Sequence, residues 1–187
     1  MEGLLLRARA GRLTAPWPRA ATLTTRRLVL EPLRPGHARE LAPVLADPAL
    51  HEFTGGEPES EAQLHARYTR QAAGQSPDGT RGWLNWFARD RASQAPVGTV
   101  QATISDDDGG GGGRSAELAW VIATGRQGDG LATEAAGAAM EWLRDQGVTR
   151  FVAHIHPGHF ASAAVARHLG LAATDERHEG EVRWVGS

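Results

Sequence analysis

The segment Arg126–Ala136 reads RQGDGLATEAA and is the most informative part of the chain. Two glycines, Gly128 and Gly130, lie between an apolar strand pattern and a long helical pattern. Glycine lets the backbone pass close to a bulky anion, and the first amides of a helix present N–H groups that have no intrahelical partner. The helix dipole adds about half a positive charge at the same end. The segment therefore predicts a phosphate cradle built mainly from main chain.

Two better-known phosphate loops fit this segment poorly. A Walker A loop needs a lysine followed by Ser or Thr, yet the chain contains no lysine, and its 20 basic residues are all arginine. A dinucleotide fingerprint needs a third glycine, where this chain has Thr133. The remaining alternative is a plain strand-to-helix turn, because glycine commonly marks such turns.

The composition limits the classes of function. The 187 residues suffice for one domain with its own core. A net charge of -2 and a pI of about 6.4 leave no basic surplus, so we expect no nucleic-acid partner. The chain has no cysteine, which excludes disulfides, a thiolate nucleophile and a cysteine zinc site. Leu4–Leu6 is too short an apolar run for a signal peptide or a membrane span, so we expect a cytoplasmic protein with no membrane partner.

Periodicity along the chain predicts both strands and helices. Residues 1–22 lack a sustained period and are interpreted as an N-terminal extension, followed by one domain over residues 23–187. The strands expected are 24–32, 83–88, 97–104, 116–122, 151–155 and 182–185. Helices are expected after Pro35, after Pro58, from Leu131 to a stop at Gly147, and over 160–169. The order predicts an α+β (α/β) fold, with a mixed sheet of about six or seven strands flanked by about four helices.

Two motifs resemble a known family. Gln127-x-x-Gly130-x-Ala132 fits the Q/R-x-x-G-x-G/A signature of the Gcn5-related N-acetyltransferases, the GNAT superfamily. The segment from His156 into the helix at Ser162 resembles the helix start N-x-x-S of the same family. From about residue 23 onward, the chain is similar to the branch that acetylates the N-termini of ribosomal proteins. The resemblance implies the GNAT fold, acetyl-CoA as cosubstrate, and direct acetyl transfer to the primary amine of a protein N-terminus or of a small molecule.

The resemblance also implies which residues bind acetyl-CoA. The loop would grip the pyrophosphate, and the strand before it would pair with the pantetheine arm, with an amide near Ile122 polarising the thioester carbonyl. The cofactor-binding residues implied in this way are Trp120, Val121, Ile122, Arg126, Gln127, Gly128, Asp129, Gly130, Leu131, Ala132, Thr133, His159 and Ser162.

Glu117 and Ser162 are the catalytic candidates. Glu117 projects from the strand implied to carry the thioester, on the face opposite Trp120, and would act as a base through an ordered water. An α-amino group, whose reference pKa is about 7.7–8.0, needs only a modest base. The branch is thought to use a serine, matched here by Ser162, to protonate the departing thiolate. The alternatives are a solvated carboxylate at Glu117 and a hydroxyl at Ser162 that satisfies helix amides.

Two residues depart from the family pattern. His159 replaces an asparagine that contacts CoA, and Ala166 stands where many relatives have a tyrosine acid. A non-catalytic domain that senses acyl-CoA is therefore a second hypothesis. His154, His156 and His159 suggest zinc, but no nearby carboxylate supports them and acetyl transfer needs no metal, so we expect none. A homodimer is compatible with the sequence. An acceptor pocket would be lined by Trp83, Asn85, Trp86, His37 and His51.

Overall fold

One mixed sheet of eight strands forms the centre of the molecule. The computed structural model describes residues 16–53, 55–106 and 113–187. The strand order is β1-β2-β3-β4-β5-β6-β8-β7. Only β5 and β6 run parallel among the neighbouring strands of the described chain. The strands are β1 (Leu23–Thr24), β2 (Leu28–Pro32), β3 (Gly82–Asp90), β4 (Pro96–Asp106), β5 (Arg114–Ile122), β6 (Val148–Ile155), β7 (Ala172–His178) and β8 (Glu181–Gly186).

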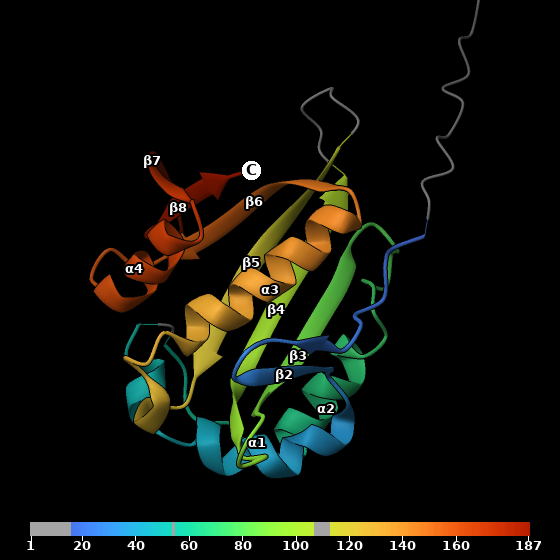
Figure 1. Cartoon of the computed structure of the whole chain (residues 1–187), viewed down its shortest axis with the longest axis vertical. Coiled ribbons are helices and arrows are strands. Elements are labelled where there is room, and N and C mark those ends of the chain that lie inside the picture. Colours follow the sequence, from blue (N-terminus) through green and yellow to red (C-terminus); the bar gives the residue numbers. More distant parts are fainter. Residues whose placement is uncertain (1–15, 54, 107–112) are drawn as a thin grey trace, which may run out of the picture.

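Helices cover both faces of this sheet. The α-helices are α1 (Ala38–Leu45), α2 (Glu61–Gln71), α3 (Leu131–Asp145) and α4 (Phe160–His168), and the short 3-10 helices are η1 (Pro35–His37), η2 (Pro48–His51) and η3 (Thr124–Arg126). Figure 1 shows α3 lying along the sheet, α1 and α2 at the lower end of the molecule, and α4 below the β7–β8 hairpin on the left. The predicted α/β fold with a mixed sheet and four helices is confirmed.

Strand alternation divides the core into two clusters. Trp86 and Phe87 are both fully buried, but on opposite faces of β3. Trp86 belongs to the large cluster that α3 covers, whereas Phe87 packs with Leu41 of α1 and Leu64 of α2. Consecutive residues of a strand point to opposite faces, so a strand that is apolar at successive positions is buried on both sides.

The structure has more strands than the sequence predicted. β1 has two residues, which is too short to give a periodic signal. β7 reads AATDERH and is mostly exposed, because it is the outer strand of the sheet and pairs only with β8. Charged side chains on an outer strand discourage pairing with another chain, and they also remove the apolar alternation by which strands are recognised.

The segment before β1 contacts the domain where the structure describes it. The indole Nε1 of Trp17 donates a hydrogen bond to the carbonyl of Gly79 at 2.9 Å. The indole Nε1 of Trp86 donates to the carbonyl of Ala21 at 2.8 Å, and the ring of Trp17 packs against the large core cluster. Residues 1–15, the greater part of the expected extension, lie outside the described residues.

In the described ranges, no helix combines the length and the apolar character that crossing a bilayer requires.

Candidate functional site

The loop between β5 and α3 has the geometry of an anion site. Gly128 and Gly130 adopt positive φ angles of 84° and 74°, and Gly130 is the N-cap residue of α3. The amide of Glu134 donates to the carbonyl of Gly130 at 3.1 Å and begins the helical ladder. Within the described ranges, none of the six preceding amides, from Gly128 to Thr133, has a hydrogen-bond acceptor. We call these six amides the cradle. A row of free N–H groups at a helix start attracts an anion.

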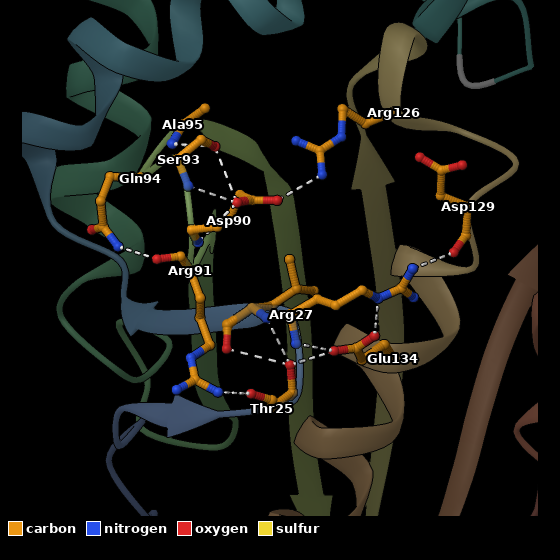
Figure 2. Close-up of polar contacts among 12 residues, drawn as sticks. Thr25, Arg27, Asp90, Arg91, Ser93, Gln94, Ala95, Arg126, Asp129 and Glu134 are labelled. Atoms are coloured by element: carbon orange, nitrogen blue, oxygen red, sulfur yellow. Dashed lines mark hydrogen bonds and ion pairs between the residues drawn. The ribbon is translucent and has the colours of Figure 1, made fainter.

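Side chains tie the cradle to its surroundings. Figure 2 shows the guanidinium of Arg27 between the carboxylate of Glu134 and the carbonyl oxygen of Asp129. On the other side of the loop, Nη2 of Arg126 forms an ion pair with the carboxylate of Asp90 at 2.8 Å. The side-chain nitrogen Nε2 of Gln127 donates a hydrogen bond to the carbonyl oxygen of Ile122 at 3.0 Å. The side chains of Arg126 and Gln127 are thus engaged in contacts that hold the loop in place.

Strands β5 and β6 separate before β5 reaches the loop that carries the cradle. Their parallel pairing begins at Arg114 and ends at Glu117, which pairs with Val152. β6 continues to Ile155 by pairing with β8, so the end of β5 loses its neighbour on that side. A cavity of about 140 Å³ lies between the two strands. Its lining includes four of the predicted residues, Trp120, Val121, His159 and Ser162, and none of the predicted residues from Arg126 to Thr133. Ile122 is 5 % exposed and points into the core that α3 covers.

Glu117 lies at the point where the strands separate. Its side chain is on the same face of β5 as Ala119 and Val121, and 52 % of it is exposed. One carboxylate oxygen, Oε1, lies 3.1 Å from Nδ1 of His154 on β6. His154 also lines the cavity between the strands. The carboxylate predicted as a base is therefore solvent-accessible and has an imidazole partner that the sequence analysis had considered only as a zinc ligand.

His159 caps the helix that carries Ser162. Its Nδ1 accepts the amide N–H of Ser162 at 3.5 Å, so it is the N-cap of α4. The ring of Phe53 stacks on the His159 ring with centroids 4.5 Å apart. Burial lowers the pKa of His159 below its ordinary value, and the neighbouring His156 lowers it further. Neutral imidazole is thereby favoured, which keeps Nδ1 available as an acceptor. Among the described residues, no cluster of three metal-ligating side chains forms.

A second, larger cavity lies on the face of the sheet that carries α1 and α2. Its volume is about 410 Å³, and it reaches Val121, which also lines the smaller cavity. Of the residues predicted for an acceptor pocket, Asn85 and His51 line it. His37 and Trp86 are instead core residues: His37 packs on Phe87, with ring centroids 4.6 Å apart, and Trp86 is fully buried. Trp83 is not part of the lining.

Helix α2 supplies lining residues that the sequence analysis missed. Tyr68 and Arg67 line the larger cavity, and in the described structure the Tyr68 hydroxyl and the Arg67 Nε are buried without a hydrogen-bond partner. Burial raises the pKa of Tyr68, which keeps the hydroxyl protonated and able to donate. Nη1 of Arg67 pairs with Glu59 at 2.6 Å. The signal available was a capped amphipathic helix with Tyr68 on its buried face, but its partner strands lie elsewhere in the sequence.

Comparison with known proteins gives a consistent result. Residues 27–172 match the family model described as "Acetyltransferase (GNAT) domain". An acetyltransferase from Agrobacterium tumefaciens str. C58 superposes with a TM-score of 0.69 at 22% identity, covering 90% of this chain and 95% of that chain. RimL, a ribosomal L7/L12 alpha-N-protein acetyltransferase in complex with coenzyme A, gives 0.71 at 16% identity, with 89% and 97% covered.

A third similar structure contains a small molecule in addition to acetyl-CoA. The acetyltransferase AAC(6')-Ib in complex with paromomycin and acetyl-CoA superposes with a TM-score of 0.67 at 18% identity, covering 86% of this chain and 93% of that chain. No curated protein matches the sequence significantly.

Proposed function

Because this chain belongs to the GNAT acetyltransferase family, we propose that it transfers the acetyl group of acetyl-CoA directly to a primary amine in a ternary complex. The observation that carries this proposal is the row of free amides from Gly128 to Thr133, which follows the strand β5 whose end lines the cavity between β5 and β6. Main-chain donors at a helix start suit a pyrophosphate. Beyond Glu117, the backbone of β5 pairs with no strand of the described chain on the side of β6. The amide groups of an extended pantetheine arm can pair with this backbone in the way that an added strand pairs with a sheet edge.

The proposed chemistry requires little from the protein beyond orientation and proton transfer. The amine nitrogen attacks the thioester carbon, the C–S bond breaks, and the thiolate leaves. Glu117, working through water, accepts a proton from the amine, and its contact with His154 fixes the carboxylate at the separation point. Ser162 lines the same cavity and donates a proton to the departing sulfur, while its hydroxyl takes a proton from solvent water. A thiolate with a pKa near 8.5 is a stable leaving group, so this acid need not be strong.

The larger cavity is the proposed site of the amine acceptor. Val121 belongs to the linings of both cavities, so an amine held in the larger one would lie near the proposed thioester. Its lining includes Glu57, whose carboxylate attracts an ammonium group before it is deprotonated, whereas the neighbouring Glu59 is neutralised by its ion pair with Arg67. The description of RimL as an alpha-N-protein acetyltransferase supports a protein α-amine as acceptor, and the paromomycin bound to AAC(6')-Ib supports a small-molecule amine. A cytoplasmic location fits both choices.

A panel of acceptors tests this proposal. The protein is incubated with acetyl-CoA and with peptides, polyamines and amino sugars, while free CoA is measured and each acceptor is weighed by mass spectrometry. We expect CoA release together with a mass increase of one acetyl group in at least one acceptor class. The absence of binding to acetyl-CoA would refute the proposal at its base.

A regulatory domain that binds acyl-CoA without turnover is the second candidate. Ala166 is fully buried in the core, so the position where many relatives carry a tyrosine offers no hydroxyl. His159 uses Nδ1 to cap α4. Tight acetyl-CoA binding without turnover of any acceptor in the panel would favour this candidate over the transferase.

A further inference from the structure

We propose that Arg27 is a positioning residue for the acetyl-CoA site, acting through the main chain of the cradle. This inference rests on the proposed function, because it assumes that the cradle binds the pyrophosphate. Arg27 lies in the turn between β1 and β2, 102 residues before the loop that it contacts. Its guanidinium reaches both the carbonyl of Asp129 and the carboxylate of Glu134, in the first turn of α3 (Figure 2).

Four hydrogen bonds join the β1–β2 turn to this end of α3. Nε of Arg27 donates to Oε2 of Glu134 at 2.6 Å, and Nη1 donates to the carbonyl oxygen of Asp129 at 2.8 Å. The other carboxylate oxygen, Oε1, accepts the main-chain amide of Arg27 at 2.8 Å and the hydroxyl of Thr25 at 2.6 Å. We call this group, Thr25, Arg27, Glu134 and the Asp129 carbonyl, the clamp. Only 16 % of the Glu134 side chain and 33 % of the Arg27 side chain are exposed.

The clamp determines the direction of a cradle amide. In a planar trans peptide, the carbonyl oxygen of one residue and the N–H of the next point in opposite directions. The Asp129 carbonyl is turned toward Arg27, so the N–H of Gly130 in the same peptide plane points away from it. Gly130 has a left-handed φ of 74°, and a side chain added there would pass 3.8 Å from Nη2 of Arg27. Without the hydrogen bond from Arg27 to Asp129, a loop with two flexible glycines has many alternative conformations. Ordering the loop would then cost part of the free energy of anion binding.

The clamp also neutralises the negative charge of Glu134, which lies close to the proposed pyrophosphate site. Glu134 carries a carboxylate within one turn of the free amides, where it would repel a pyrophosphate. Although burial opposes ionisation, the hydrogen bonds from Thr25 and Arg27 lower the pKa of Glu134 below its ordinary value, so it is a full anion at neutral pH. The guanidinium of Arg27 cancels this charge with a short charge-assisted bond. Loss of Arg27 therefore both releases the loop and exposes the anion to repulsion.

A second arginine provides a matched control, because it supports the same turn without touching the cradle. Nη1 of Arg91 donates to the carbonyl of Thr25 at 2.8 Å, and its main-chain amide donates to the carbonyl of Arg27 at 2.8 Å. Figure 2 shows the Arg91 side chain extending along the turn, whereas that of Arg27 extends to the start of α3. A substitution at Arg91 thus measures what the turn contributes to stability. A substitution at Arg27 disturbs the same turn and also removes the contact with the loop, so the difference between the two variants measures the effect of that contact.

The experiment compares Arg27→Met, Arg27→Lys and Arg91→Met in the full chain. Calorimetry measures the Kd for CoA, thermal denaturation measures Tm, and steady-state kinetics separate the KM for acetyl-CoA from kcat and from the KM for the amine. We expect Arg27→Met to weaken CoA binding about tenfold or more and to raise the KM for acetyl-CoA, with kcat and the KM for the amine nearly unchanged. Arg27→Lys keeps the charge but not the forked contact, so it should restore part of the affinity. Arg91→Met should bind CoA within about twofold of the original protein.

Glu134→Gln separates the two effects of the clamp. In the Arg27→Met background it removes the exposed carboxylate, and it should recover part of the lost CoA affinity if repulsion contributes. If the original protein binds CoA and Arg27→Met binds it equally well, the inference is overturned while the proposed function stands. Equal losses of affinity in Arg27→Met and Arg91→Met, in step with Tm, would also overturn it, since the turn would then act through stability alone. Failure of the original protein to bind CoA would remove both the proposed function and this inference.

Discussion

At the scale of a single residue, the carboxylate of Glu117 has both the access and the partner that a base requires. It is half-exposed, lies where β5 and β6 separate, and contacts His154. Because general-base catalysis contributes roughly 10²–10⁴-fold, and because an α-amine is easily deprotonated, we expect Glu117→Gln to lower kcat by about 10- to 100-fold near neutral pH. The Kd for acetyl-CoA should stay nearly constant. A pH–rate profile checks the assignment, and identical rates for both proteins across the pH range would remove Glu117 as the base.

Gly130 adopts a left-handed backbone conformation that residues with a side chain disfavour. Its φ is 74°, and a Cβ added there meets only Nη2 of Arg27 at 3.8 Å, an ordinary contact. The cost therefore comes from the backbone and is about 1–2 kcal/mol for a residue forced into the left-handed region. We expect Gly130→Ala to lower Tm and to weaken CoA binding.

Gly36→Ala is the matched control for this substitution. Gly36 lies in η1, where an added Cβ meets nothing within 4 Å and φ is not positive. Calorimetry with CoA should show unchanged affinity for this variant. Unchanged affinity for Gly130→Ala as well would show that the cradle does not need this backbone conformation.

Sequence alone identified the glycines of the cradle and the face on which Glu117 lies, because both follow from local spacing. It did not identify Arg27, whose contact with Asp129 spans 102 residues and carries no local pattern. It placed Trp86 in an acceptor pocket, whereas the strand alternation of β3 turns Trp86 into the core and turns Asn85 toward the cavity. A single strand has two faces, and only the position of the helices decides which face is buried and which is open.

At the scale of elements, the start of α2 is set by a reciprocal cap. The amide of Gln63 donates to the hydroxyl oxygen of Ser60, and the main-chain amide of Ser60 donates to Oε1 of Gln63 at 2.8 Å. Removing an N-cap hydroxyl costs about 1 kcal/mol, which corresponds to a fall in Tm of roughly 2–4 °C in a protein of this size. Ser60→Ala should show this fall.

The two halves of this cap should be coupled. Gln63→Ala removes the reverse bond, so the double variant should lose less stability than the sum of the two single variants. Thermal denaturation of all four proteins measures the coupling. Strict additivity would show that the two bonds form independently and that the cap is not reciprocal.

The elements that the sequence missed share one property: their stability comes from neighbours and not from their own residues. β7 pairs with β8 along the outer side of the sheet and exposes most of its side chains. β1 pairs two residues with β2. The long helix α3, in contrast, buries Leu131, Met140 and Leu143 on one face and was predicted within about two residues of its observed end at Asp145.

At the scale of the whole molecule, two histidines make the fold sensitive to acid. Burial lowers the pKa of His37, near α1, and of His159, at the start of α4, below the ordinary value of 6.5. As the pH falls through 6.5, the unfolded chain binds protons at these positions before the folded chain does, so the free energy of unfolding decreases. We expect Tm to fall between pH 7.5 and pH 5.5.

A substitution at the cap of α4 tests this origin of the acid sensitivity. Asparagine caps helices as well as any residue and does not titrate, so His159→Asn should keep α4 intact and reduce the dependence of Tm on pH. Thermal denaturation at several pH values measures the slope for both proteins. An equal slope in the variant would show that His159 makes no contribution to acid sensitivity.

The six free amides of the cradle have a consequence for mutagenesis and for sequence drift. Alanine retains its main-chain N–H, so alanine at Asp129 or Thr133 would leave the proposed pyrophosphate contacts in place and would give weak phenotypes. The side chains at these two positions are correspondingly free to diverge. Sensitivity to mutation should concentrate instead at distant positions that orient the backbone, where a conventional scan of the loop would not look.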